Sequence, residues 1–116
     1  MQAQAQVMSY ANRRFLPRFS HGDMAQIAKI TGTEHATRLG TGFARFRQAE
    51  IPWQVKYDEV VLVIEGRLKI RTEQEALEAG PRDCIWLPKD TKLTYLAEDA
   101  LVFYAIDPAN WAVAGT

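Results

Sequence analysis

The stretch IPWQVKYDEVVLVIEG, residues 51–66, decides the fold of this chain. It places Glu59 directly before an apolar run of Val, Leu and Ile, and Gly66 closes that run. β-Branched and large apolar residues favour a strand, and glycine favours the turn that follows it. The stretch therefore predicts a buried β-strand that begins at a carboxylate, which makes Glu59 the first candidate functional residue.

The segments after residue 40 all have the composition of short strands. Each is rich in Val, Ile, Phe, Tyr, Leu or Thr, and Gly, Pro, Asp or charged turns separate them. In chain order they are TGFARFR, VVLVIEG, RLKIRT, EALEAG, DCIWLP, LTYLA and ALVFYAI. DMAQIAKI at residues 23–30 fits a short helix or a strand, and we favour a strand because Gly22 and Gly32 bracket it. Many short strands predict an all-β sandwich or barrel.

Length and charge limit the function classes that such a fold could serve. A chain of 116 residues suffices for one domain with a core, and its 14 basic and 14 acidic side chains give zero net charge. No basic field would attract nucleic acid or anionic lipid, and no apolar run is long enough to span a bilayer. Cys84 is the only cysteine and suits a reducing compartment. We expect a cytoplasmic protein that binds neither nucleic acid nor membranes.

The N-terminal part differs from the rest of the chain. Residues 1–9 alternate Gln with Ala and have no apolar face to bury, so we expect a flexible tail followed by one barrel domain at residues 10–116. In the next segment, RRFLPRFS, Pro17 favours an edge strand. Such a strand is suited to covering an exposed sheet edge on a neighbouring subunit, and on that ground we expect a homodimer.

Two motifs point to one architecture. Cupins carry a first motif, G-x5-H-x-H-x3-4-E-x6-G, and a second, G-x5-P-x-G-x2-H-x3-N, which together supply strands of one small barrel. Glu59 and Gly66 match the end of the first motif, and DCIWLPKDTKL around Pro88 resembles the second. This resemblance implies an all-β fold consisting of a single small cupin, an RmlC-like jelly-roll β-barrel.

A closer resemblance is carried by PWQVKYDE at residues 52–59 and PANW at residues 108–111, with EGRL, LPK and VFYAI between them. Together they resemble the C-terminal cupin domain of the ethanolamine-utilisation Q protein (EutQ-type) family over residues 41–111. The resemblance implies an association with acetate and acetyl phosphate interconversion using ATP. This chain has no G-x4-G-K-[ST] loop to cradle phosphates. Longer members carry an additional N-terminal region, and we expect any microcompartment attachment carried by it to be absent.

The metal-binding positions of the cupin pattern are not kept. The first two histidine positions fall on Trp53 and Val55, or on Pro52 and Gln54 in the other spacing, and the third falls on Leu93. The asparagine position falls on Ala97, and the two glycines of the second motif fall on Arg82 and Asp90. A transition metal needs several N, O or S donors that converge on one point. With Glu59 as the one ligand left, and His21 and His35 outside both motifs, we predict no metal and no cofactor.

Strand alternation predicts the lining of a cup. If Glu59 points inward, Tyr57 and Val55 do so too, and Leu93 and Tyr95 face them from the returning strand. Trp53 would lie at the mouth. Burial should raise the pKa of Glu59 above its free value of about 4.3, while a hydrogen bond from a tyrosine hydroxyl should lower it. We predict Glu59 and Tyr57 as catalytic residues, and a small-molecule ligand bound by the remaining four: Trp53, Tyr95, Leu93 and Val55.

Structural explanations compete with this one. Glu59 could accept hydrogen bonds from Tyr57 or Tyr95 and hold the barrel mouth together. Tryptophans mainly contribute buried area, so Trp86 and Trp111 are predicted as packing residues, with Trp53 the exception. Cys84 lies in an apolar segment and is predicted as a core thiol.

Two functions of different class follow, and the sequence does not decide whether the protein is an enzyme. The barrel is either a metal-independent enzyme that acts on a small polar metabolite, or a non-catalytic metabolite-binding or assembly module of a catabolic pathway. Glu59→Gln separates them, because it should abolish turnover in the first case and lower stability in the second.

Overall fold

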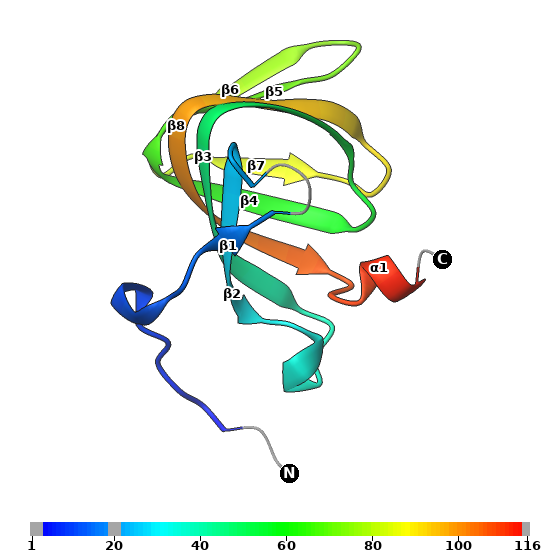
Figure 1. The fold of residues 1–116 in the computed structure, drawn as a ribbon. Helices are drawn as coiled ribbons and strands as arrows, with labels where there is room; N and C mark the ends of the chain where they lie inside the picture. The colour runs from blue at the N-terminus through cyan, green and yellow to red at the C-terminus, as the bar shows by residue number, and fades with distance from the viewer. Residues whose placement is uncertain (1–3, 19–21, 115–116) are drawn as a thin grey trace.

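Strands make up most of the computed structural model, which describes residues 4–18 and 22–114 (Figure 1). The strands are β1 (Leu16–Pro17), β2 (Ala25–Thr31), β3 (Gly40–Gln54), β4 (Asp58–Gly66), β5 (Leu68–Arg71), β6 (Ala76–Ala79), β7 (Cys84–Leu87) and β8 (Lys92–Asp107). Two 3-10 turns, η1 (Tyr10–Asn12) and η3 (Thr33–His35), and the single helical turn α1 (Trp111–Ala114) complete the described part. The predicted all-β class is confirmed, and the ambiguous segment at residues 23–30 forms β2. The boundary between a tail and a barrel at residue 10 stays a prediction.

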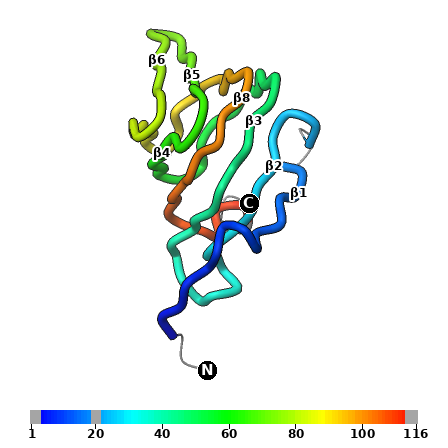
Figure 2. Tube along the Cα trace, turned by 90° about the vertical axis from the view of Figure 1, so that its left-hand side faces the viewer, coloured from blue at the N-terminus to red at the C-terminus, as the bar shows by residue number. Residues whose placement is uncertain are grey.

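The long antiparallel pair β3 and β8 forms the frame of the barrel. Strand order along the sheet is β1-β2-β3-β8-β4-β7, with β5 pairing both β6 and β8. Both long strands curve over the top in Figure 1, and Figure 2 shows them running side by side. Each predicted short segment in this region is therefore part of a longer, bent strand.

The pairing of β3 with β8 is interrupted at Gln48. Arg47 lies opposite Asp99 and Ala49 opposite Ala97, so the offset between the strands is unchanged, and Gln48 between them takes a φ of 45°. The inward-facing set changes phase on both strands at this interruption, from Phe46 to Ala49 on β3 and from Tyr95 to Ala100 on β8. The bend lets the same two strands contribute to both walls of the barrel.

Three turns use the left-handed backbone region. Gly66 has a φ of 77° between β4 and β5, and a Cβ there would collide with the carbonyl oxygen of Asp99. Arg82 and Asp90, at the two glycine positions of the second cupin motif, have φ values of 73° and 77°. The backbone of the motif is thus kept although its glycines are replaced, at a conformational cost that glycine would not have.

The N-terminal strand pairs within its own chain. Leu16 lies opposite Ile27, and the amide of Arg18 donates to the carbonyl of Ala25 at 3.0 Å. A Cβ on Gly22 would come within 2.5 Å of the Cβ of Pro17, so glycine permits the close return of the chain. In this chain the segment covers the edge of its own β2, and its contact with a neighbouring subunit, like the homodimer, stays a prediction.

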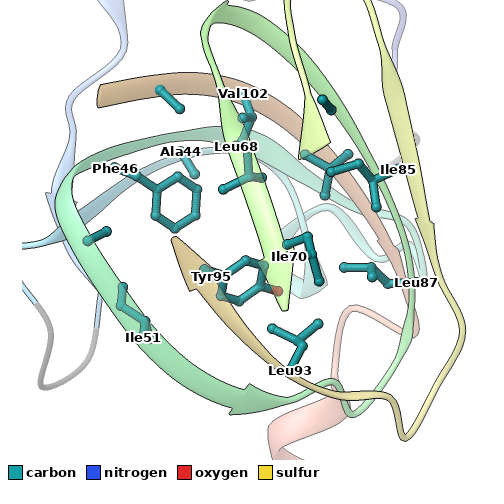
Figure 3. Close-up of a cluster of buried hydrophobic side chains, with 14 of the residues drawn as sticks. Ala44, Phe46, Ile51, Leu68, Ile70, Ile85, Leu87, Leu93, Tyr95 and Val102 are labelled. Carbon is teal, nitrogen blue, oxygen red and sulfur yellow. The ribbon is translucent and has the colours of Figure 1, made fainter. Parts of the chain in front are cut away.

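The core lies inside the barrel, where strands from both walls face one another (Figure 3). Phe46 stacks on Tyr95 with ring centroids 5.6 Å apart. The largest side chains that are fully buried are Ile51, Leu68, Ile70, Leu87, Val55, Val63 and Val102. Among the helical segments of the described residues, none is long and apolar enough to cross a membrane.

Strand β7 corrects two predictions. Ile85 and Leu87 point into the core, so the alternating residues Cys84 and Trp86 point outward. Trp86 is 58% exposed and Cys84 is an exposed thiol, so neither is a core residue. β7 is the last strand in the strand order, and one of its faces points outward. Because the segment is short and apolar on both faces, its sequence did not show which face that is.

Candidate functional site

A cavity of about 320 Å³ opens at one end of the barrel. Its walls come from β2, β3, β4, β5 and β8, with Trp111 of α1 beside them. Val61, Leu68 and Phe46 supply apolar surface. The polar side chains that line the cavity are Arg18, Lys29, Thr31, Thr33, Thr41, Tyr57, Glu59, Tyr95, Tyr104 and Asn110. A partly apolar hollow with a few converging polar groups is the usual form of a small-molecule site.

Glu59, near the start of β4, is the acidic group of this cavity. Its side chain is 7% exposed, and its Oε1 accepts a hydrogen bond from the hydroxyl of Tyr95 at 3.1 Å. Burial raises the pKa of Glu59 to about 7, although the Tyr95 hydrogen bond and the charge of Arg18 both act to lower it. A carboxyl group with this pKa gains and loses its proton near neutral pH.

Tyr57 is held by a tryptophan rather than by the carboxylate. The indole Nε1 of Trp53 donates to the hydroxyl oxygen of Tyr57 at 3.2 Å. Trp111 packs against both rings, with centroid separations of 5.7 Å to Trp53 and 5.3 Å to Tyr57. Burial and then the charge of Glu59 raise the pKa of Tyr57 to about 12, so its hydroxyl stays protonated and able to donate.

Arg18 is the site residue that sequence reasoning missed. Its side chain is 7% exposed, and its Cζ lies 4.7 Å from the centroid of the Trp53 ring and 5.8 Å from that of Tyr95. These distances are those of cation–π contacts. The residue follows β1 and lies outside both cupin motifs, so no motif spacing signalled it. Its positive charge lowers the pKa of Glu59 and of Tyr57.

Tyr104 of β8 was also missed, and a glycine makes room for it. Gly42 lies opposite Tyr104 in the β3–β8 register, where a Cβ would come within 2.6 Å of the tyrosine hydroxyl. Burial, followed by the charge of Glu59, raises the pKa of Tyr104. The alternation of β8 gave no signal for this residue, because Leu93 and Tyr95 point inward at odd positions whereas Val102 and Tyr104 do so at even positions.

The structure brings together three of the six predicted site residues as cavity lining: Glu59, Tyr57 and Tyr95. Trp53 is half-buried and does not line the cavity, but it contacts Tyr57 and Arg18. Val55 and Leu93 are buried members of the core cluster and do not line the cavity either. Their inward direction follows the predicted alternation, but the space beside them is filled by packed side chains.

The residues present do not fit a metal. The positions at which the cupin pattern has histidines carry Trp53, Val55 and Leu93, none of which offers a donor to join Glu59. Across residues 4–18 and 22–114, no three His, Cys, Asp or Glu side chains gather closely enough to hold a metal ion. His35 lies in η3, where its Nδ1 accepts the amide of Gly32, and His21 lies outside the described residues. Metal independence stays a prediction that a metal titration tests.

Comparisons with known proteins agree on one family. Residues 15–113 match the family model described as ethanolamine utilisation protein EutQ. A protein named acetate kinase EutQ from Escherichia coli K12 is 31% identical over 83 residues, which cover 71% of this chain and 35% of that protein. A protein of the same name from Clostridioides difficile 630 is 32% identical over 91 residues, covering 78% of this chain and 58% of that protein. The chain therefore spans between about a third and three fifths of these relatives.

Solved structures share the fold. A crystal structure described as ethanolamine utilization protein Q from Salmonella typhimurium LT2 superposes with a TM-score of 0.83 at 24% identity, covering 90% of this chain and 86% of that one. An RmlC-like cupin from Shewanella frigidimarina gives a TM-score of 0.72 at 11% identity, covering 94% and 96%. At these identities the likeness establishes the fold alone, and it confirms the predicted RmlC-like cupin barrel.

Proposed function

Because this chain belongs to the family of ethanolamine utilisation protein EutQ, we propose that it is a metal-independent cupin acting on or binding a small polar metabolite of ethanolamine or acetate catabolism. The observation that carries the proposal is the buried carboxyl group of Glu59, which borders an open cavity and is held by Tyr95. We also propose a cytoplasmic location, which suits the exposed free thiol of Cys84.

In this proposal Glu59 is the general acid or base. A pKa of about 7 lets it hold a proton in one step and accept it back in another at neutral pH. Tyr57 lines the same cavity and donates a hydrogen bond to the metabolite. Tyr95 is a positioning residue, because its hydroxyl fixes the carboxyl group. Trp53 acts through Tyr57 and Arg18, both of which it contacts.

Acetate is the first ligand to test. The relatives from Escherichia coli and Clostridioides difficile are named acetate kinases, but this chain spans 35% and 58% of their lengths. A cavity of about 320 Å³ has room for a molecule the size of acetate and for larger organic acids. We propose acetate or a related small acid as the ligand. We propose no role in phosphoryl transfer for any residue of this chain.

The alternative function is a non-catalytic binding or assembly module, and one surface favours it. The outward residues Val60, Leu62 and Ile64 of β4 lie beside Cys84 and Trp86 of β7, with Val60 opposite Trp86 and Leu62 opposite Cys84. Val60, Ile64 and Trp86 are exposed. An apolar outer face of this kind suits a protein contact, and we propose that it forms the homodimer interface. Sedimentation of the wild type and of Trp86→Lys tests this, since a dimer that persists in the variant contradicts it.

A thermal-shift screen tests the proposed function. The panel contains acetate, acetyl phosphate, ATP with magnesium, ethanolamine, small hydroxy acids and divalent metals. A ligand at 100 times its dissociation constant adds about 2.7 kcal/mol, which shifts the midpoint by several degrees in a domain of this size. We expect a small polar metabolite to raise the unfolding midpoint of the wild type, and we expect the size of this shift to differ in Glu59→Gln. Glu65→Gln, which removes an exposed carboxylate of the same strand, is the matched control. Stabilisation by a metal alone would contradict the proposal.

A further inference from the structure

We propose that the ligand is a small organic anion, that Arg18 binds its charged group, and that binding places a proton on Glu59. The inference rests on the proposed function, since it takes the same cavity as the ligand site. It adds the residue that recognises the charge of the ligand and a coupling between binding and pH.

The charges that line the cavity favour an anion. Among the described lining residues, Arg18 and Lys29 are cationic and Glu59 is the one acid. Arg18 is 7% exposed, so its charge is largely removed from bulk water and gains most from a counter-charge beside it. A cationic ligand would place a further positive charge near a buried guanidinium, which would oppose binding. The cavity therefore selects against an ammonium group and for a carboxylate or similar group.

The setting of Arg18 suits recognition of a carboxylate. Its guanidinium lies over the ring of Trp53 at 4.7 Å and near the ring of Tyr95 at 5.8 Å, so aromatic faces orient it. A guanidinium has its N–H donors in its own plane, and a planar carboxylate can accept two of them at once. Since Tyr95 also donates to Glu59, the same aromatic ring positions both the cation and the acid.

A bound anion and the carboxylate of Glu59 compete for Arg18. In the empty cavity a charged Glu59 balances Arg18. When a second negative charge enters this confined space, the charge of Arg18 can no longer offset both. Uptake of one proton by Glu59 restores the balance, leaving a cation, an anion and a neutral carboxyl group. The neutral carboxyl can then donate a hydrogen bond to the ligand.

No other described group that faces Glu59 is placed to take up this proton. Tyr57, Tyr95 and Tyr104 face it, and burial raises the pKa of all three, so they are already protonated. The other facing charge is Arg18, a permanent cation, and Lys29 lies at the exposed rim. Strands β3, β5 and β7 present apolar side chains to the barrel interior. Figure 3 shows Phe46, Ile70 and Leu87 there as examples.

The coupling has a measurable size. With a pKa of about 7 for Glu59 in the free protein, affinity for the anion should fall about tenfold between pH 6 and pH 8 if only the protonated form binds. Binding at pH 8 should take up nearly one proton per ligand, and binding at pH 6 only a small fraction of one. Acetate itself is fully ionised over this range, so the change reports on the protein.

Isothermal titration calorimetry with sodium acetate tests the proposal. Titrations at pH 6 and pH 8, each in two buffers of different ionisation enthalpy, give the dissociation constant and the number of protons taken up. The proteins are the wild type, Glu59→Gln, Arg18→Met and, as a matched control on the same N-terminal arm, the exposed Arg14→Met. Ethanolamine hydrochloride is the cationic probe. Circular dichroism confirms that each variant is folded.

We expect acetate to bind the wild type and Arg14→Met with the tenfold pH effect, and Glu59→Gln with equal affinity at both pH values. Arg18→Met should weaken binding at least tenfold at either pH. Acetate binding without proton uptake, or binding that survives in Arg18→Met, overturns the inference but leaves the proposed function standing. Binding of ethanolamine in place of acetate does the same. Binding of neither probe, nor of any compound in the screen, overturns both.

Discussion

Glu59→Gln should make the protein more stable at alkaline pH. In the wild type, burial raises the pKa of this carboxyl from 4.5 to about 7 in the folded state. The folded protein therefore holds a proton that the unfolded chain has lost between about pH 4.5 and pH 7. Stability is full below this window and decreases as the pH rises through it, because ionising Glu59 in the barrel is unfavourable.

The size of the effect follows from the shift in pKa. A difference of one pKa unit corresponds to 1.36 kcal/mol, so the shift of Glu59 corresponds to about 3 kcal/mol of unfolding free energy lost by pH 8. Glutamine keeps the shape and the acceptor oxygen for the Tyr95 hydroxyl but never ionises. At pH 8 the variant should therefore exceed the wild type by about 3 kcal/mol, and near pH 5 the two should be close.

Urea unfolding followed by tryptophan fluorescence from pH 5 to pH 8 measures this difference. Subtracting the wild type from the variant at each pH cancels the titration of all other groups. Glu65→Gln, on the same strand but exposed on the exterior, should not reproduce the pH dependence. A difference that stays flat would show that burial leaves the pKa of Glu59 unchanged, and one that favours the wild type more as pH rises would show that the barrel stabilises the carboxylate; either result would refute the reasoning.

The remaining predictions concern the backbone and the exterior. Gly66→Ala should cost roughly 3 kcal/mol or more in chemical denaturation, because its φ is 77° and a Cβ would strike the carbonyl of Asp99. Gly80→Ala should cost less than about 1 kcal/mol, since its Cβ would meet only the movable end of a side chain; equal losses would contradict this. Asp90→Gly should be neutral or stabilising by up to about 1 kcal/mol at a φ of 77°, and a clear loss in the melting temperature would count against it. Cys84 should react with a thiol reagent more slowly in the wild type than in Trp86→Lys, because the proposed homodimer interface covers it; equal rates would contradict that interface.

The fold was readable from the sequence because its signals are local. Strand composition and the spacing from Glu59 to Gly66 indicated the β4 strand and its turn, and the structure has both. The backbone conformation of the second cupin motif is also kept where its glycines are replaced, since Arg82 and Asp90 take positive φ values. The flanking strands hold these turns in the left-handed conformation even though glycine, the residue that best suits it, has been replaced.

The site was only partly readable, for two physical reasons. Alternation shows which side chains point inward, but it does not show where packing leaves a space, so Val55 and Leu93 were assigned to a cavity and lie in the core. Arg18 follows β1, far in sequence from the cavity residues of β4 and β8, and only the tertiary fold places it beside Trp53. Trp86 was predicted to pack in the core and is exposed, because the sequence of a short strand that is apolar on both faces does not show which face is outward.

The most direct test of the account is a ¹H–¹⁵N spectrum of the tryptophan indoles with and without acetate. Trp53 donates its indole N–H to Tyr57, Trp111 packs beside both, and Trp86 lies on the exterior as an internal control. If the cavity beside Glu59 binds a small anion, the Trp53 and Trp111 signals should shift with acetate concentration while that of Trp86, assigned from Trp86→Phe, stays fixed. Signals that never move, or a shift confined to Trp86, would contradict the claim that this cavity is the ligand site.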